Sequence, residues 1–344
     1  MVVEIVVQFE NVRADPASMN ILCVGTLAID TVETPVGKRE RVLGGSASYF
    51  SYAASLFAPV RLVGRIGSDW PPEYTRILKE HGVDWRGVKH DSLAKSYFWH
   101  GRYHADYQDR DTLKIEMHGF DRYEPSVPDH FRESDIVFLA AAIPTVQKKV
   151  LDQCLSPKLV FADTVDMWIE STREELLDLL LRLDGLFIND AEARQLTGLS
   201  SSLQAAHAIR SLGPAWVILK KGEHGCLILG PNTTLALPAV PTVALVDPTG
   251  AGDSFAGGML GYLASRYSTL PSTPQANSSD PSHLTHQRLI IDPADMAQAM
   301  KFGTAVASFT IGGFSLDGLR AINHDQLAAR VQEIERLVGC HPQS

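Results

Sequence analysis

The sequence predicts an α/β protein with a largely parallel, buried sheet and a second, smaller sheet. From about residue 134 to 230, short apolar runs alternate with helical patterns, which is typical of repeated βα units. Before residue 130, the apolar runs carry interleaved polar residues, as expected of a sheet with one wet face. The 344 residues are enough for about two domains, or for one large domain with an appendage.

Buried strands are predicted where apolar runs lack alternation, because both faces of such strands are covered. The runs are Asp135–Leu139, Lys158–Ala162, Gly185–Ile188 and Ala215–Leu219, and a first strand is expected at Ile21–Gly25. A helix is predicted from Ser171, which forms a Ser-x-x-Glu capping box with Glu174. The leucines that follow are expected to form one apolar stripe; they are Leu176, Leu177, Leu180, Leu181 and Leu183.

The smaller sheet is predicted from two runs with interleaved polar residues, Ser96–His104 and Thr112–Phe120. The stretch Thr31–Arg41 adds a hairpin to this sheet, because it contains a Pro-Val-Gly turn. A lid over a binding site is one use for such a sheet, with lid strands from about 30–43 and 95–121.

Three aromatic residues of the predicted lid, Tyr97, Trp99 and Tyr103, share one strand face because their positions are all odd. They could stack on a sugar or on a base. Core packing of a thin sheet and a contact between the lids of two copies explain the pattern at least as well. A homodimer through the lid is therefore an expectation that remains open.

Composition excludes several classes of protein. Hydrophobic residues make up 45% and charged residues 21%, which argues against a fibrous or wholly disordered chain. The net charge of −9 gives no attraction to nucleic acid or to an anionic membrane. The longest apolar runs fall short of the ~20 residues that span a bilayer, and the N-terminus fits neither a signal nor a transit peptide. Four widely spaced cysteines suit reduced thiols, so the cytoplasm is the expected location.

The segment Asp247–Gly258 carries the strongest chemical signal, because it leads from an apolar run through glycines into a helical pattern. Gly250, Ala251 and Gly252 allow a tight turn whose N–H groups can point at one anion. Asp253 follows in the first helical turn, where a carboxylate can accept the proton of a hydroxyl that attacks a phosphoryl group. A plain packing turn with an acid favoured by the helix dipole is the alternative. Neither a P-loop nor a dinucleotide fingerprint is present.

These residues resemble a known family. Asp247–Asp253 looks like the C-terminal signature of the PfkB, or ribokinase-like, carbohydrate and nucleoside kinases, with Pro248 in place of a Thr. Three further segments agree with family elements in the same order; they are Leu43–Ser48 with Arg61–Asp69, Asn189–Glu192, and Lys221–Gly225. The resemblance runs from about Ile21 to Leu337. It implies a ribokinase-like three-layer α/β/α fold with a central, mostly parallel sheet and a small β-sheet lid.

The resemblance also implies a domain plan and roles for the residues of the Gly-rich segment. The kinase domain is expected at 21–340, after an N-terminal extension at 1–20. Within it, composition alone predicts a flexible insertion at 266–292, because this stretch is rich in Ser, Thr, Pro, Asn and Asp and has little apolar surface. Asp253 is implied as the general base, and the amides of Gly250, Ala251 and Gly252 as the anion hole for the transferred phosphoryl group.

Further positions are implied to bind the two substrates and the ions. Asp30, Gly44 and Gly45 match residues that hold acceptor hydroxyls, and Glu192 with Asn189 matches the network around Mg²⁺ and phosphate. The implied residues of the ATP site are Asn189, Lys221, Gly222, Gly225, Thr249, Gly250 and Gly252, with adenine between the loop near Gly225 and a late helix at Ala305–Thr310, closed by Gly312 and Gly313. Asp247 and Thr249 match positions that bind a monovalent cation such as K⁺ in some members.

The resemblance predicts an ATP-dependent kinase that phosphorylates a hydroxyl of a small sugar or sugar-like molecule. A primary hydroxyl is the leading expectation. Two departures leave the acceptor open: Tyr49 stands where many sugar kinases have an Asn that reaches the sugar, and Asp163–Asp166 matches no pattern that we can assign. A nucleoside kinase of the adenosine type is the main alternative, and a non-catalytic metabolite sensor is a weaker one.

Overall fold

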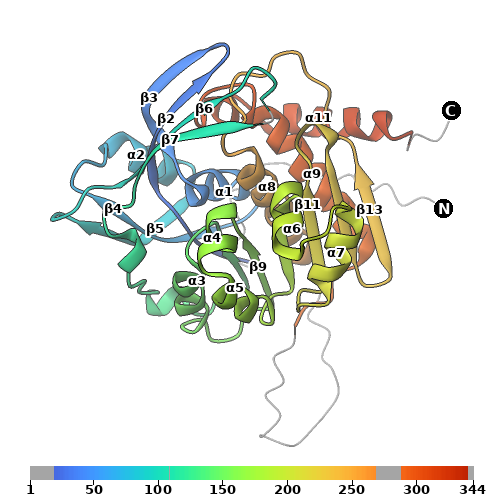
Figure 1. Ribbon diagram of the computed structural model, residues 1–344, viewed down its shortest axis with the longest axis horizontal. Helices are drawn as coiled ribbons and strands as arrows, with labels where there is room; N and C mark the ends of the chain where they lie inside the picture. The colour runs from blue at the N-terminus through green and yellow to red at the C-terminus, as the bar shows by residue number, and fades with distance from the viewer. Residues whose placement is uncertain (1–18, 108, 269–287, 340–344) are drawn as a thin grey trace, which may run out of the picture.

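The structure, a computed structural model, describes residues 19–107, 109–268 and 288–339, and it contains a nine-stranded and a four-stranded sheet (Figure 1). The strands are β1 (Ile21–Val24), β2 (Ala28–Thr34), β3 (Gly37–Gly44), β4 (Val60–Gly67), β5 (Val83–Asp91), β6 (Tyr97–Tyr103), β7 (Arg110–Glu116), β8 (Ile136–Leu139), β9 (Leu159–Asp163), β10 (Gly185–Asn189), β11 (Trp216–Lys220), β12 (Cys226–Gly230) and β13 (Thr233–Leu237). The helices are α1 (Ser46–Ala54), α2 (Pro72–Glu80), α3 (Pro144–Leu151), α4 (Asp166–Ser171), α5 (Arg173–Leu180), α6 (Asp190–Thr197), α7 (Ser202–Arg210), α8 (Ala251–Ser268), α9 (Pro293–Thr310), α10 (Asp317–Arg320) and α11 (His324–Leu337).

The large sheet has the strand order β13-β12-β11-β10-β9-β8-β1-β4-β5. All neighbours pair in parallel except β11 with β12 and β12 with β13. The strands predicted from unbroken apolar runs are present within one or two residues of their expected ends. Because parallel strands need covered faces, these runs show no alternation, and β1, β8 and β9 are buried along their whole length.

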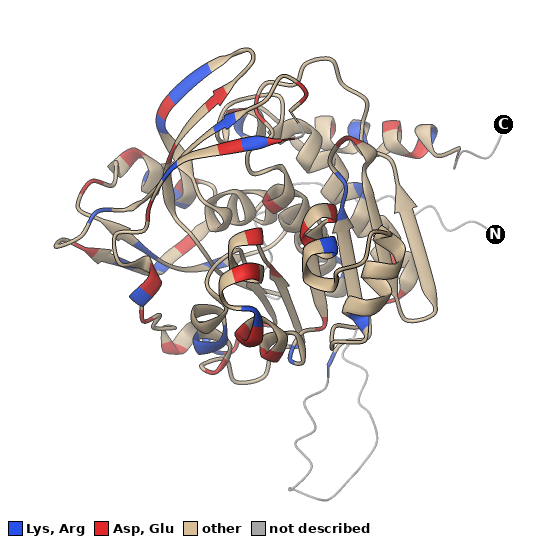
Figure 2. Cartoon of the chain, viewed as in Figure 1, with Lys and Arg blue, Asp and Glu red and all other residues tan. Residues whose placement is uncertain are grey.

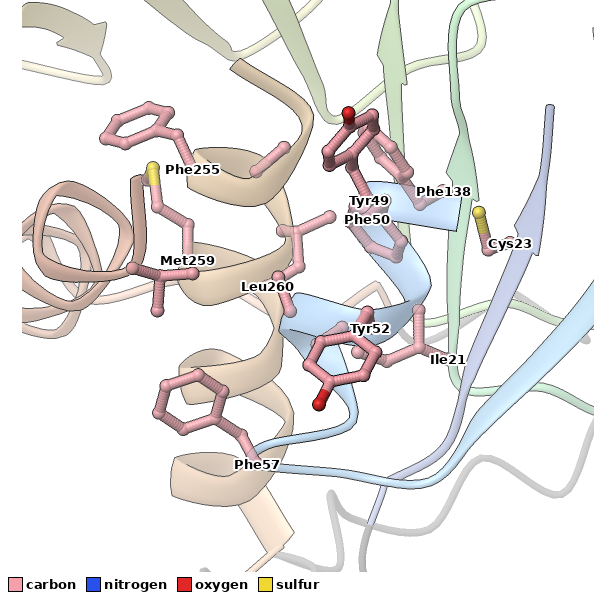
Figure 3. Packing of buried hydrophobic residues seen from close by; sticks show 14 of the residues in the cluster. Ile21, Cys23, Tyr49, Phe50, Tyr52, Phe57, Phe138, Phe255, Met259 and Leu260 are labelled. Carbon is pink, nitrogen blue, oxygen red and sulfur yellow. The ribbon is translucent and has the colours of Figure 1, made fainter. Parts of the chain in front are cut away.

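Helices cover both faces of the large sheet and give the three layers expected of the fold. On one face, α1, α8, α9 and α11 pack against alternate strand residues such as Cys23 and Phe138. Figure 3 shows part of this layer, in which Tyr49 and Phe50 of α1 lie between the sheet and α8. On the other face, α3, α5, α6 and α7 pack against the intervening residues, such as Val24 and Leu139. The predicted fold class is therefore confirmed.

The capping box predicted at Ser171 is wrong, although a helix follows. Ser171 is the last residue of α4, and its hydroxyl donates to the carbonyl oxygen of Met167 at 2.6 Å, so it cannot cap the next helix. Helix α5 begins at Arg173 after Thr172, without a side-chain cap. The predicted stripe is also shifted, because Leu181 ends the helix and is 71% exposed, whereas Leu179 is buried.

The four-stranded sheet has the order β3-β2-β6-β7 and stands apart from the large sheet in Figure 1. Strand β2 starts shortly after β1 ends, forms the predicted hairpin with β3, and pairs in parallel with β6 so that Asp30 lies opposite Trp99. The predicted strand at Thr112–Phe120 is shorter, because β7 ends at Glu116 and Phe120 turns inward to pack on Tyr97.

Charges of both signs follow one another along the small sheet (Figure 2). Glu33 on β2 is the centre of one group: it accepts a hydrogen bond from Arg102 at 2.7 Å, lies 3.0 Å from His100, and pairs with Lys38. The Arg102 and His100 hydrogen bonds lower the pKa of Glu33 to about 2. This surface of the sheet is therefore a solvated, ion-paired one, and by strand alternation Tyr97, Trp99 and Tyr103 of β6 lie on the other.

Two expected segments fall largely outside the described residues. The extension at 1–20 is described only from residue 19, and of the insertion at 266–292 the structure describes 266–268, which end α8, and 288–292. Cys23, Cys154 and Cys226 are free thiols, and Cys340 lies outside the described residues. Among the helices of the described residues, none combines the length and the apolar character needed to cross a bilayer.

Candidate active site

The Gly-rich segment forms a loop that enters α8 at Ala251, as the sequence predicts. Gly250 has a φ of +77°, a conformation that glycine adopts without strain. The ring of Tyr49 lies against the same residue, since a Cβ atom at Gly250 would come within 2.3 Å of the ring. Two independent constraints therefore require a glycine here, one from the backbone and one from a neighbouring side chain.

Of the three amides at the start of α8, one already donates a hydrogen bond to the backbone. The N–H of Ala251 donates to the carbonyl oxygen of Pro248 at 3.2 Å, so this one of the three predicted donors already has a partner. The amides of Gly250 and Gly252 donate to no backbone acceptor in the described part of the chain. Because the first N–H groups of a helix lack intrahelical acceptors and lie at its positive end, an anion is the complementary partner.

Asp253 lies in the first turn of α8, half-buried beside these amides. Burial and the nearby Asp163 raise the pKa of its carboxyl and Lys220 opposes the rise, so that the pKa is about 7. A carboxylate with a pKa near neutrality can both take and release a proton under ordinary conditions. The predicted general base is therefore in an environment that suits proton transfer.

Lys220 and Asp163 form a pair beside Asp253 that the sequence did not assign. Nζ of Lys220 lies 2.5 Å from Oδ2 of Asp163, and a Cβ atom at Gly252 would be 3.3 Å from the same Nζ. Burial alone would lower the pKa of Lys220, but the charges of Asp163, Glu192 and Asp253 outweigh it and raise that pKa. The ammonium group is thus charged and lies close to the start of α8.

The family resemblance implied Lys221 as a residue of the ATP site. Lys221 lies in the turn after β11, whereas Lys220 is the last residue of that strand. Its amide donates to the carbonyl oxygen of Gly225 at 2.8 Å and closes the turn that contains Gly222. Gly222 and Gly225 have φ values of +55° and +82°, and a Cβ at Gly225 would collide with the carbonyl oxygen of Leu237. This loop is therefore a tight turn after β11 whose shape is set by its backbone, and its role as a nucleotide-phosphate loop stays a prediction.

Asn189 and Glu192 form a capping box at the start of α6. The Asn189 side chain accepts from the amide of Glu192, and Glu192 Oε2 accepts from the amide of Asn189, both at 2.8 Å. Burial raises the pKa of Glu192 to about 7, and the charge of Lys220 opposes the rise. These two residues are therefore structural in the absence of ligand, and Glu192 faces the same ammonium group as Asp253.

Asp30 is the third residue of β2, and its side chain occupies the space in front of the paired glycines Gly44 and Gly45. A Cβ at Gly44 would lie 1.8 Å from Oδ2 of Asp30, and one at Gly45 would collide with the backbone of Thr26. Burial raises the pKa of Asp30 to about 8, the amide of Gly45 opposes the rise, and the charges of Asp247 and Asp253 add to it. The carboxyls of Asp30 and Asp253 are thus close enough to influence each other.

Asp247 and Thr249 lie beneath the loop. Oδ1 of Asp247 accepts from the amide of Thr249 at 2.9 Å, and the fully buried Oδ2 has no hydrogen-bond partner among the described residues. The carbonyl oxygen of Ile311 accepts from the amides of Val246 and Asp247, which brings the chain after α9 against this loop. A buried carboxylate oxygen without a donor suits a cation, so the residues present fit the monovalent ion that the resemblance implies.

The lid touches the loop directly. The hydroxyl of Thr249 donates to the hydroxyl of Tyr103 on β6 at 3.2 Å, and the hydroxyl of Tyr107 donates to the carbonyl oxygen of Leu245 at 3.4 Å. Trp99, also on β6, is half-buried and donates through Nε1 to Thr112 at 3.4 Å. The three aromatic residues therefore do not act alike: Tyr97 packs on Phe120, the ring of Trp99 lies over Gly101, and Tyr103 contacts the loop through Thr249.

The comparisons with known proteins decide the family. The family model described as pfkB family carbohydrate kinase matches residues 18–318. The chain belongs to the PfkB family. It is therefore a phosphotransferase, as the signature at Asp247–Asp253 predicted.

Curated relatives of this PfkB protein include a cytidine kinase of Thermococcus kodakarensis, 30% identical over 72% of this chain and 90% of the relative. An aminoimidazole riboside kinase of Salmonella typhimurium is 25% identical over 72% of this chain and 82% of its own length. Among solved structures, the nucleoside kinase of Methanocaldococcus jannaschii matches with a TM-score of 0.67 at 18% identity, covering 92% of this chain and 98% of that one. A putative ribokinase II of E. coli, in complex with ATP and Mg²⁺, matches with a TM-score of 0.65 at 16% identity, covering 94% of this chain and all of that one.

The structure of this PfkB kinase brings together Asp30, Gly250, Gly252 and Asp253 as predicted, and it adds Asp163, Lys220 and the ring of Tyr49. Asp163 ends β9 and Lys220 ends β11. A usable signal was present in the sequence, because polar residues at the carboxyl ends of parallel strands face the binding crevice of an α/β sheet. The buried Lys220 is recognisable only once β11 is known to end there.

Proposed function

We propose that this PfkB kinase transfers the γ-phosphoryl group of ATP to a primary hydroxyl of a ribose-containing acceptor, with nucleosides as the first candidates. The observation that supports the proposal is that Asp253 lies in the first turn of α8, next to the free amides, and within electrostatic reach of the carboxyl of Asp30. The relatives named as cytidine, aminoimidazole riboside and nucleoside kinases support a nucleoside, and a small free sugar stays the second candidate.

In the proposed reaction, Asp253 accepts the proton of the acceptor hydroxyl as that oxygen attacks the phosphorus. The amides of Gly250 and Gly252 donate to the oxygens of the transferred group, and Lys220 adds a positive charge next to them. The start of α8 holds the two amides in place, and the ion pair with Asp163 holds Lys220 in place. These donors therefore need little rearrangement when charge moves onto the phosphoryl oxygens. Tyr103 and Trp99 of the lid exclude water from the acceptor side.

The ATP site is proposed along the ends of β10 and β11, with Asn189, Lys221, Gly222, Gly225 and Thr249 around the nucleotide. The side chain of Cys226 interacts with that of Thr304 of α9, so the turn at Gly225 lies near the late helix, which supports an adenine site between them. No described group of three or more His, Cys, Asp or Glu side chains is arranged to hold a metal ion. Mg²⁺ is commonly held by one or two carboxylates and by the phosphates themselves, which fits Glu192.

Bound Mg²⁺ would bridge phosphate oxygens and neutralise part of their charge. Glu192 would hold it through the carboxylate oxygen that takes no part in the capping box, since Oε2 already accepts a hydrogen bond from the amide of Asn189. A K⁺ ion next to Oδ2 of Asp247 would satisfy that buried atom and stabilise the loop. A homodimer through the lid stays a prediction, because nothing in the described residues reveals a second copy.

The proposal is tested by ADP release from Mg-ATP with cytidine, inosine, ribose, other sugars and polyols. Asp253→Asn should reduce turnover by about 10²-fold or more, because general-base catalysis typically contributes that much, while thermal stabilisation by ATP is kept. Asp317→Asn, on the exposed start of α10, is the matched control with one carboxylate fewer. Normal turnover in Asp253→Asn would refute the mechanism. Thermal stabilisation by one compound without turnover of any would favour a metabolite sensor.

A further inference from the structure

A cluster of basic and hydroxyl side chains lies outside the active site, at the ends of four helices. Its members are Tyr52 in the last turn of α1, His81 directly after α2, Arg320 at the end of α10 and His324 at the start of α11. In Figure 3 the hydroxyls of Tyr49 and Tyr52 point in opposite directions along α1. Because the ring of Tyr49 contacts the loop before α8, the cluster lies on the side of α1 that faces away from the phosphoryl-transfer site.

The hydroxyl of Tyr52 lacks a partner. Tyr52 is only 5% exposed, and its hydroxyl forms no hydrogen bond within the part of the chain that the structure describes. Burial raises the pKa of Tyr52, and the charge of Arg320 opposes the rise, so the guanidinium group acts on this hydroxyl. A hydroxyl that leaves water without a new hydrogen-bond partner costs stability. A ligand that accepts from this hydroxyl would remove that cost.

The ring of His81 is held in one orientation. It stacks on Tyr52 with 4.0 Å between the ring centroids. The hydroxyl of Ser55 donates to the carbonyl oxygen of Tyr52 at 2.8 Å, so its single hydrogen is used. Oγ of Ser55 therefore accepts from Nδ1–H of His81, at 2.7 Å. In the neutral ring Nε2 is then the nitrogen that carries no hydrogen, and it can take a proton from a ligand.

The cluster contains no buried acid that could balance its basic groups. Burial lowers the pKa of His81, and the charge of His324 lowers it further. No carboxylate of the described residues contributes notably to this shift or to that of Tyr52. Asp317 approaches Arg320 only to 3.9 Å, and their side chains are 71% and 50% exposed, so this pair is weak. The complementary partner is therefore an anion.

We propose that Tyr52, His81 and Arg320 form a binding site for a phosphate group, either of inorganic phosphate or of a phosphate monoester. The hydroxyl of Tyr52 and the guanidinium group of Arg320 donate to phosphate oxygens, and the planar guanidinium matches two of them at once. Nε2 of His81 shares a proton with a further oxygen, which a phosphate monoester with a second pKa of about 6 can supply. The site does not depend on the proposed function.

The test follows the imidazole of His81 by NMR in protein labelled with ¹⁵N-histidine, with the signal assigned by its loss in His81→Gln. Inorganic phosphate and ribose 5-phosphate are added at constant ionic strength and near-neutral pH. We expect a saturable shift of the His81 signal, and protonation of His81 at a higher pH when phosphate is bound, because the anion stabilises the imidazolium form. Phosphate bound at the start of α8 does not contact His81, so the two sites give separate signals.

Matched variants decide whether the proposed groups bind the phosphate. Arg320→Gln should raise the Kd about tenfold or more, and Tyr52→Phe about fivefold, the sizes of a charge-assisted and a neutral hydrogen bond. Arg336→Gln is the control, because it removes an exposed arginine from the last turn of α11. It should change the Kd by less than about twofold, since salt screens a distant exposed charge.

A saturable shift that Arg320→Gln and Tyr52→Phe weaken, and Arg336→Gln does not, would support the site, and the tighter of the two compounds would identify the source of the phosphate group. The absence of a saturable shift with both compounds would overturn it. Equal weakening in all three variants would also overturn it, since only general charge would then be involved. Without phosphate, Tyr52→Phe should unfold at the same temperature as the wild type or at a higher one; a lower temperature would assign the hydroxyl to a partner within the protein and refute the site.

Discussion

The buried pair Lys220–Asp163 should control the pH dependence of the reaction through Asp253. Asp163 raises the pKa of Asp253 and Lys220 lowers it, with a resulting value of about 7. The base is active when deprotonated, so kcat/KM should fall as pH drops through this value. Lys220→Met removes the opposing positive charge and should move the acid limb of the pH profile to higher pH. Asp163→Asn removes a negative charge and should move that limb to lower pH.

The size of the effect follows from the pKa. At pH 7 about half of the Asp253 carboxyls are charged. A rise of the Asp253 pKa by one unit, ~1.4 kcal/mol, leaves about one tenth of them charged, which is a ~5-fold loss of kcat/KM at pH 7. A fall of one unit raises the charged fraction at pH 6 from about one tenth to about one half. Each profile is normalised to its own high-pH plateau, because Lys220→Met also removes a charge from the phosphoryl site.

Two controls make the result specific. Lys221→Met removes a neighbouring lysine that closes the turn after β11, and it should leave the acid limb in place. Glu192 has a pKa of about 7 as well, so the Lys220→Met and Asp163→Asn shifts are repeated in a Glu192→Gln background, which keeps a side chain able to form the capping box. If both variants moved the limb in the same direction, or if the shifts vanished in that background, Asp253 would not be the titrating base.

Two further predictions concern the backbone of the site. Gly250→Ala should destabilise the protein by about 1–3 kcal/mol more than Gly198→Ala, measured by urea unfolding. Both glycines have φ above +70°, but a Cβ at Gly250 would collide with the ring of Tyr49, whereas a Cβ at Gly198 meets nothing within 4 Å. Equal decreases in the free energy of unfolding would contradict the packing of Tyr49 on Gly250. Asn189→Ser should keep the cap of α6 and the free energy of unfolding while the KM for ATP rises, whereas Asn189→Ala should also lose about 1 kcal/mol of stability. An unchanged KM for ATP in both would remove Asn189 from the ATP site.

Much of the fold was predictable because its signals are local. The unbroken apolar runs at β8 to β11 indicated covered strands, and the glycines on either side of Ala251 indicated a turn into a helix. The capping box at Ser171 failed because a short helix, α4, takes that serine as its last residue. Such competition between adjacent helices depends on packing that the sequence pattern does not contain.

The site was predictable where the backbone dictates the residue and unpredictable where distant strands meet. Gly44 and Gly250 are recognisable because only glycine fits beside Asp30 and at a φ of +77°. Lys220 and Asp163 are 57 residues apart and come together only because β9 and β11 flank β10. The lysine that the motif named, Lys221, is its sequence neighbour, but β11 ends at Lys220, so Lys221 belongs to the turn that follows the strand.

The contact between Gly250 and Tyr49 has a consequence for which of the two positions can vary between related kinases. Glycine at position 250 is demanded by the backbone whatever lies next to it, and so it always leaves an empty space where a side chain would be. An aromatic ring at position 49 can occupy that space without any compensating change in the catalytic loop. The residue at position 49 can therefore change in a single substitution without a compensating change in the backbone of the loop before α8.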